Sequence, residues 1–296
     1  MKKYLYSIVF AALILMCTPV VNASNEVYYI NKNNIEMTEA EYNNLLDLGF
    51  TRNYIDSMTT NEFIANKDLD GTVVSEARKF IKTSTIMRNG IKITRTEEIT
   101  KEEAEGLQSH KIINRDPAGN YYDGMIMNSV IVMTTKIVGL DDDTMRFMNT
   151  VEWLVLPTNR HHDIIGIGFD SSLVQFDSII VCKQLWVDEE YNDIYDFICS
   201  PKYVNTGGLA IIKLPEGTIQ SLESNLYFNV IKQNNVGTIT SLYAVGDYAH
   251  AVSDVTPTNL LSHITVNDSS GVIIDATYAD IFESTSPAVA AFIGTW

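Results

Sequence analysis

Apolar and polar positions alternate along most of the second half of the chain. The two longest runs are MIMNSVIVMTTKIVG (125–139) and DTMRFMNTVEWLVLP (143–157). In the second run, apolar side chains from Met145 to Val155 share one face, and Arg146 and Glu152 share the other. A period of two with one apolar face is the pattern of a half-buried antiparallel strand.

Further runs of this kind follow at 162–169, 173–187, 208–214, 218–232, 236–252, 261–267 and 271–275. Gly, Asn and Pro separate them, and no helix-length period lies between them, which disfavours a parallel α/β sheet. The pattern predicts a mainly antiparallel β-sandwich over residues 119–296.

The first half of the chain instead contains sequence signals for helix N-termini. Thr38 and Glu41 form a capping box, the stretch Thr59–Glu62 repeats it, and Gly49 is suited to end the first helix. A short helix around Tyr54 is expected between the two. A further short helix over Ser75–Ile81 belongs only to the calcium-loop alternative for residues 66–77.

A β-hairpin is predicted after these helices. The arms of TSTIMRNGIKITRTEEIT (83–100) are rich in β-formers and flank Asn89-Gly90, a strong turn signal. Thr100 to Glu103 then resembles a capping box that opens a short acidic helix. The polar stretch 115–120 indicates a domain boundary.

The predicted fold class is therefore α+β. A small N-terminal helical and hairpin region (24–118) precedes the antiparallel β-sandwich (119–296), and residues 1–23 have the layout of a secretory signal. In this signal Lys2 and Lys3 precede an apolar run, and Ala23 ends a small-residue cleavage site. A lipid anchor at Cys17 is a weaker alternative.

The apolar run is too short to span a bilayer, and no later segment has the ~20 apolar residues that a spanning helix needs. We therefore expect no transmembrane helix in the mature chain and an extracellular or cell-surface location. Loss of Lys2 and Lys3 with the signal changes the net charge from −16 to −18. Such acidity argues against nucleic-acid partners and leaves a protein or glycan at the cell exterior. The fifteen tyrosines could supply the contact surface.

Two cysteines, Cys182 and Cys199, remain once the signal is removed. In an oxidising exterior we expect them to form a disulfide, worth roughly 3 kcal/mol in the chain-entropy model. Two free thiols are the alternative.

Candidate chemistry centres on TNRHHDIIGIGF (158–169). His161 and His162 are adjacent, and adjacent side chains on a strand point to opposite faces, so one metal could not bind both without a turn. We interpret them as a polar loop before a buried strand. The alternative is a binding or metal-assisted catalytic site completed by Asp247 or His250, which requires separations of about 4–6 Å.

A calcium loop is the second candidate. Asn66, Asp68 and Asp70 match its first, third and fifth positions, but Ala77 stands where a bidentate carboxylate is needed. We favour an Asp-Gly turn here and a solvated turn at Asp141–Asp143. No cofactor is predicted, with calcium as the alternative.

Three phrases taken together resemble a group of uncharacterised exported proteins of Gram-positive bacteria. They are YNNLLDLGFTRNYIDSMTTNEFIANKDLDG, VEWLVLPTNRHHDIIGIGF and LYAVGDYAHAV. The resemblance implies export. The group carries no assigned activity and no catalytic residues to transfer.

No phosphate-binding glycine loop, HExxH, GxSxG or Cys–His pair is present in the sequence. The expected function is non-enzymatic binding of a ligand or partner through sandwich loops or a sheet face. One alternative is a membrane-active protein resembling pore-forming toxins, which would insert the hairpin Met125–Val155. A metal-assisted hydrolase is the least favoured.

Overall fold

The computed structural model describes residues 26–88, 91–113, 121–122, 125–157, 159–188, 190, 193–196 and 199–296. The expected signal (1–23), the turn residues Asn89 and Gly90, and the expected boundary at 115–120 lie outside the described residues.

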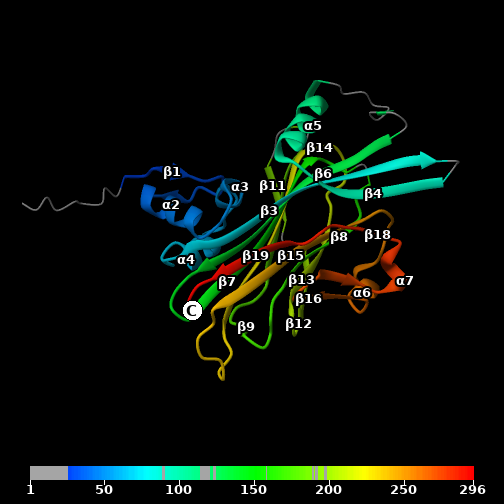
Figure 1. Cartoon of the computed structure of the whole chain (residues 1–296). Coiled ribbons are helices and arrows are strands. Elements are labelled where there is room, and N and C mark those ends of the chain that lie inside the picture. Colours follow the sequence, from blue (N-terminus) through cyan, green and yellow to red (C-terminus); the bar gives the residue numbers. More distant parts are fainter. Residues whose placement is uncertain are drawn as a thin grey trace, which may run out of the picture.

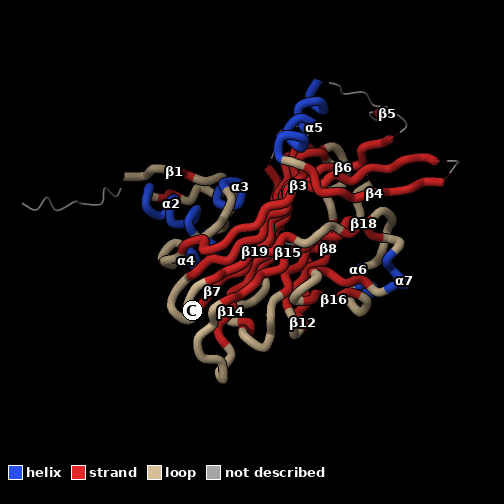
Figure 2. Tube along the Cα trace, in the orientation of Figure 1, coloured by secondary structure: helices blue, strands red, loops and turns tan. Residues whose placement is uncertain are grey.

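Two antiparallel sheets face each other as a sandwich (Figures 1 and 2). The larger sheet contains β3 (Thr72–Arg88), β4 (Ile91–Ile99), β5 (Tyr121–Tyr122), β6 (Met125–Gly139), β7 (Thr144–Val155), β9 (Val174–Phe176), β10 (Val181–Asp188), β11 (Asp193–Asp196) and β14 (Ile219–Lys232). The smaller sheet contains β8 (His162–Gly168), β12 (Cys199–Val204), β13 (Gly207–Lys213), β15 (Ser241–Ala251), β18 (Phe282–Ser284) and β19 (Ala288–Ile293).

The strand order in the larger sheet is β11-β10-β14-β7-β6-β3-β4, with β5 beside β6 and β9 beside β14. The order in the smaller sheet is β12-β13-β8-β15-β18, with β19 beside β15. Apolar side chains from both sheets form the main core, including Phe147 and Phe228 from one sheet and Ile165 and Tyr248 from the other. The predicted antiparallel sandwich is confirmed.

The predicted hairpin forms, and its strands belong to the larger sheet. β3 pairs with β6 from Thr72 opposite Gly139 to Ile86 opposite Met125. The sandwich therefore includes strands on both sides of the expected boundary at 118. The helix that the calcium-loop alternative would require over Ser75–Ile81 does not form. This segment is part of β3, where Ala77 packs against the main core and its neighbours face outward.

Three short helices form as expected: α2 (Glu39–Asp47), α3 (Arg52–Asp56) and α4 (Thr60–Asn66). Both capping boxes are present, and Gly49 follows the C-cap of α2 with φ 86°. We call these helices, with β1 (Tyr29–Ile30) and β2 (Glu36–Met37), the helical unit. It packs on the outer face of the larger sheet, where Leu45 and Tyr54 share a cluster with Val138 and Tyr227.

The helix α5 (Lys101–Ile113) covers a second part of that outer face. The amide of Glu103 donates to the Thr100 hydroxyl at 3.2 Å, which confirms its predicted N-terminus. Ala104 packs against Val130 and Val155. Two separate covers therefore lie on one sheet face, the helical unit and α5 (Figure 1).

The outer face of the smaller sheet carries a hairpin of β16 (Ile264–Asn267) and β17 (Gly271–Ile274), flanked by α6 (Pro257–Leu260) and α7 (Ala276–Ala279). The hairpin approaches β8 so closely that a Cβ on Gly168 would collide with the Asn267 carbonyl. This contact explains why residue 168, the second glycine of IIGIGF, has no side chain.

Candidate functional site

The aspartate that follows the two histidines is the centre of a buried polar cluster. Asp163 is fully buried on β8 and accepts hydrogen bonds from the Tyr248 hydroxyl, from His250 Nδ1 (3.0 Å) and from the Ala251 amide (3.0 Å). Trp153 meets the His250 ring at 5.4 Å between centroids. Two side chains of β15, Tyr248 and His250, are thus joined by one carboxylate of β8.

This cluster has the composition of an acid–base pair and is buried. His250 is 7% exposed. Its burial lowers the pKa, while the charge and hydrogen bond of Asp163 outweigh that effect, so the pKa is raised. Neither Asp163 nor His250 lines a hollow of the groove described below. The cluster therefore joins β8 to β15 inside the sandwich.

Asp247 lies on the opposite face of β15 from His250. Its carboxylate accepts from the Tyr248 amide (2.8 Å), the Val272 amide (2.9 Å) and the Thr285 hydroxyl (2.7 Å). Burial raises its pKa to about 6, against the lowering effect of these hydrogen bonds. Asp247 thus holds β17 onto the smaller sheet.

The adjacent histidines do not join either carboxylate. His162 begins β8, and its Nδ1 lies 3.9 Å from Asp254 Oδ1. Burial lowers its pKa. His161 precedes the strand, and its carbonyl accepts from the Leu214 amide. Within the described ranges, no group of three or more His, Cys, Asp or Glu is arranged to hold a metal ion.

The residues of the calcium motif have other partners. The buried Asn66 amide donates to the Glu62 carbonyl at 2.7 Å, and Asp68 pairs with Lys67 at 3.3 Å. Asp70 precedes Gly71, and β3 begins at the next residue. The segment that should supply the twelfth ligand is strand, not loop. Asp141–Asp143 form an exposed turn between β6 and β7.

The predicted Cys182–Cys199 disulfide is present, with a Cα–Cα distance of 6.1 Å. Cys182 lies on β10 of the larger sheet and Cys199 on β12 of the smaller one. The bond therefore fastens the two sheets together, which sequence spacing alone did not indicate.

A groove runs across the outer face of the larger sheet, between the helical unit and α5. It consists of two adjoining hollows of about 730 and 740 Å³, counted with their open mouths, which share Gln108, Glu152 and Leu154. The groove extends from Arg78 on β3 to Leu185 on β10. It thus crosses five neighbouring strands, a span of about 19 Å at ~4.8 Å per strand.

The floor of this groove carries two carboxylates on neighbouring strands, Glu152 on β7 and Glu223 directly opposite on β14. Thr51 (2.7 Å), Asn53 (3.0 Å) and Asn225 (2.9 Å) all donate to Glu223. Glu152 receives no hydrogen bond from the part of the chain that the structure describes. The Glu152 side chain is exposed to the groove. Partial burial and the charge of Glu223 nevertheless raise its pKa.

Basic groups surround these carboxylates. Arg78 contacts Glu76 at 3.2 Å, and Lys101 lies 3.6 Å from Glu105 on the α5 wall. From β6 of the floor, Lys136 donates to the Gly49 carbonyl of the helical unit at 2.9 Å. Burial lowers the pKa of Lys136, and Glu76 opposes that effect. The groove therefore offers both charge signs to a ligand.

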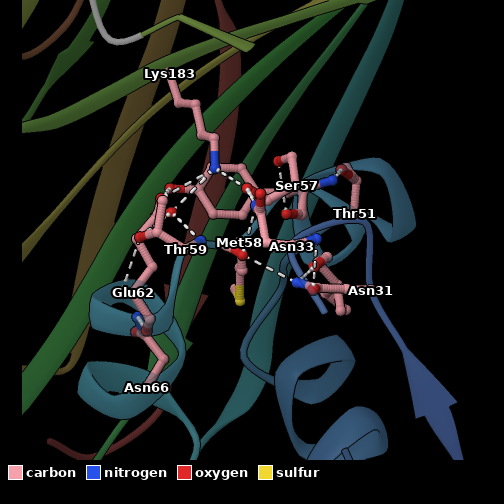
Figure 3. A network of polar contacts seen from close by, with 11 residues as sticks. Asn31, Asn33, Thr51, Ser57, Met58, Thr59, Glu62, Asn66 and Lys183 are labelled. Carbon is pink, nitrogen blue, oxygen red and sulfur yellow. Dashed lines mark hydrogen bonds and ion pairs between the residues drawn. The ribbon is translucent and has the colours of Figure 1, made fainter. Parts of the chain in front are cut away.

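The wall formed by the helical unit is fixed by a buried lysine from the sheet (Figure 3). Lys183 is fully buried on β10. Its ammonium group donates to the Ser57 carbonyl at 2.7 Å and to Glu62 Oε2 at 3.0 Å, and lies 4.8 Å from the Tyr54 ring centre. Burial lowers the Lys183 pKa, and Glu62 opposes that effect. Glu62 also completes the α4 capping box.

A second buried cation lies under the same wall. The Arg146 guanidinium packs over the rings of Phe50 (5.3 Å) and Tyr227 (4.9 Å), and its Nε donates to Asn229 at 3.0 Å. The sequence pattern placed Arg146 and Glu152 on a polar face but gave no sign that a helical unit covers part of it. The signal that was overlooked is Lys183, a charge inside the apolar run VCKQLWV.

Comparisons with known proteins assign no family. No family model matches the sequence, and no curated protein matches it. Among solved structures, the collagen binding domain of Erysipelothrix rhusiopathiae surface protein RspB is 4% identical, with a TM-score of 0.26, over 57% of this chain and 70% of that one. The C-terminal domain of the Streptococcus agalactiae AgI/II polypeptide BspA is 7% identical, with a TM-score of 0.28, over 74% of this chain and 80% of that one.

Structures with TM-scores this low are too different from this chain for their functions to be transferred to it. None of the helices in the described part of the chain is long and apolar enough to cross a bilayer.

Proposed function

We propose that this is an exported, non-enzymatic binding protein that holds an extended polypeptide segment of a partner in the groove between the helical unit and α5. The observation that carries the proposal is the groove itself, open along five strands, with Glu152 on its floor, a carboxylate that accepts no hydrogen bond from the described residues. Its span of about 19 Å accommodates about six extended residues at ~3.3 Å each.

The charges favour a polypeptide over a uniformly charged polymer. Glu152 and Glu223 occupy the floor, and Arg78 and Lys101 stand toward the β3 end. A ligand that satisfies both must carry both signs along its length, as polypeptides commonly do. Electrostatic complementarity of this kind contributes specificity more than raw affinity.

Selection from a display library of random peptides of about ten residues tests the proposal, with the chain 24–296 as bait. We expect enrichment of peptides that carry a basic residue, and we expect Glu152→Lys to shift the preference to an acidic one. Thr150→Trp should obstruct the floor and abolish enrichment. Asn235→Trp, on the exposed loop between β14 and β15, is the matched control.

Equal enrichment by the wild-type and Thr150→Trp proteins would contradict the groove assignment. Sustained hydrolysis of ester, peptide or glycoside substrates that His250→Ala abolishes would contradict the non-enzymatic assignment.

A further inference from the structure

A further hollow lies next to β9 and β12. Figure 1 shows these two strands at the end of the sandwich away from α5. It measures about 800 Å³ with its open mouth. The turn after β8, the strand β9, the β12–β13 turn and the residue after β14 line it. No residue of the groove takes part, so the two sites are separate.

Aromatic rings form one side of this hollow. Tyr203 is 50% exposed and meets the Phe176 ring edge-on, with centroids 5.1 Å apart. Phe176 in turn packs on Phe228 in the core at 4.7 Å. The Ile180 amide donates to the Tyr203 hydroxyl at 2.8 Å, which fixes the ring's orientation. An exposed aromatic ring is therefore held in place before any ligand arrives.

Amide side chains also line the hollow. Gln233 donates through Nε2 to the Ser171 carbonyl (3.0 Å) and the Val174 carbonyl (3.4 Å). Its amide oxygen receives no hydrogen bond from the described residues. The Gln175 and Asn205 side chains likewise have no hydrogen bond within that part of the chain. Each amide can donate and accept.

The lining is uncharged although the protein is strongly acidic. None of the described residues that line the hollow is Asp, Glu, Lys, Arg or His. The net charge of the chain is −16. A site without an ionic partner favours a neutral ligand, since a buried unpaired charge would be costly.

We propose that this hollow binds a neutral saccharide. The C–H face of a sugar ring packs on the fixed Tyr203 ring, and the sugar hydroxyls, which both donate and accept, pair with the amides of Gln175, Asn205 and Gln233. A few oriented polar groups beside an apolar surface are the usual composition of a small-ligand site. The proposal is independent of the groove and of its polypeptide ligand.

Isothermal titration calorimetry tests it, with the chain 24–296 and neutral pentasaccharides of glucose, galactose and N-acetylglucosamine as probes. At least one should bind saturably. Tyr203→Ala should weaken that binding about tenfold or more, whereas Tyr203→Phe, which keeps the ring, should change it by less than about threefold. Asn205→Ala should weaken it by an intermediate factor.

Tyr243→Ala is the matched control, because Tyr243 is also on a strand of the smaller sheet, is 45% exposed and lies outside the hollow. Equal thermal unfolding of the Tyr203 and Tyr243 variants shows that the site, not the fold, was changed. The groove variant Thr150→Trp should bind the sugar normally. Absence of binding to all three probes, or binding that Tyr203→Ala retains, would overturn the proposal.

Discussion

The two faces of the larger sheet are stabilised in different ways, although the same strands supply both. The inner face meets the smaller sheet through rings and aliphatic side chains such as Phe147, Leu226 and Phe228. The outer face meets the helical unit around two buried cations, Lys183 and Arg146. Apolar packing tolerates volume-conserving changes, whereas a buried charge depends on a specific partner.

This difference bears on function because the outer-face contacts form one wall of the groove. The helical unit is positioned by Lys183, Glu62 and Glu223, so loss of one partner should displace the wall while the sandwich remains folded. Disruption of the apolar packing on the inner face should instead unfold the whole sandwich.

The largest effect is expected for Lys183→Ala, which leaves Glu62 without its buried cation. We expect a loss of about 3–5 kcal/mol in the free energy of unfolding, measured by urea denaturation. Lys79→Ala, which breaks the partly exposed Lys79–Glu98 pair of 2.9 Å, is the matched control and should cost less than about 1 kcal/mol.

Lys183→Met combined with Glu62→Gln should cost less than the sum of the two single changes, because neither charge is then left alone. Strict additivity would show that the two side chains do not act as a pair.

The next largest loss of stability is expected when the disulfide between the two sheets is removed. Replacing both Cys182 and Cys199 with serine should cost about 3 kcal/mol, because the unfolded chain regains the freedom of the closed loop. Urea unfolding of the double variant measures this loss. Reduced wild-type protein should behave like the variant, and a stability equal to that of the oxidised protein would contradict the prediction.

A pH-dependent effect is expected at Asp247. Its pKa is about 6 in the folded chain, against an ordinary value of 3.8 for aspartate in the unfolded chain, so the folded state binds more protons between these values. Stability should therefore fall as the pH rises from about 3.8 to about 6, by at most about 3 kcal/mol, and stay lower above. Asp247→Asn should lack this fall in unfolding free energies measured between pH 3.5 and 7.

His250 acts in the same direction at higher pH. Its pKa is raised above 6.5, so its stabilising contribution is complete below pH 6.5 and is lost as the pH rises through the raised value. His250→Gln should remove this part of the profile without affecting the part due to Asp247. Loss of both parts in one variant would show that the two groups are coupled.

The smallest effect is expected at the edge of the groove. Thr51 caps α3 and donates to Glu223 at 2.7 Å, so Thr51→Ala should cost about 1 kcal/mol. Thr51→Ser keeps the hydroxyl and should cost less. Thermal unfolding of the two variants, side by side, measures the difference.

Local signals were sufficient for the elements whose stabilising contacts lie close in the sequence. Thr38 with Glu41 and Thr59 with Glu62 predicted two helix starts, because a capping box joins residues three apart. The hairpin arms around residues 89–90 and the alternation in β7 were equally local. The helix of the calcium-loop alternative, over Ser75–Ile81, does not form because this short pattern also fits a strand, and pairing with β6 decided the outcome.

The candidate site shows the opposite. The sequence offered His161, His162, Asp247 and His250, but the structure pairs His250 with Asp163, from a strand 87 residues away. The groove was not predicted at all, since its floor comes from five strands and its walls from two helical segments. Which carboxylate meets which histidine depends on strand register, and register is set by pairing between distant segments.

The sequence by itself determined the strand-rich character of the chain, the cysteine pair and the polar face of β7. Each of these follows from residue type and short-range spacing. Only the tertiary structure decided that the polar face is partly buried beneath the helical unit, that the disulfide joins the two sheets and that Tyr203 stands beside Gln175 and Asn205. These contacts exist because apolar burial brings distant segments together, and no local pattern encodes their partners.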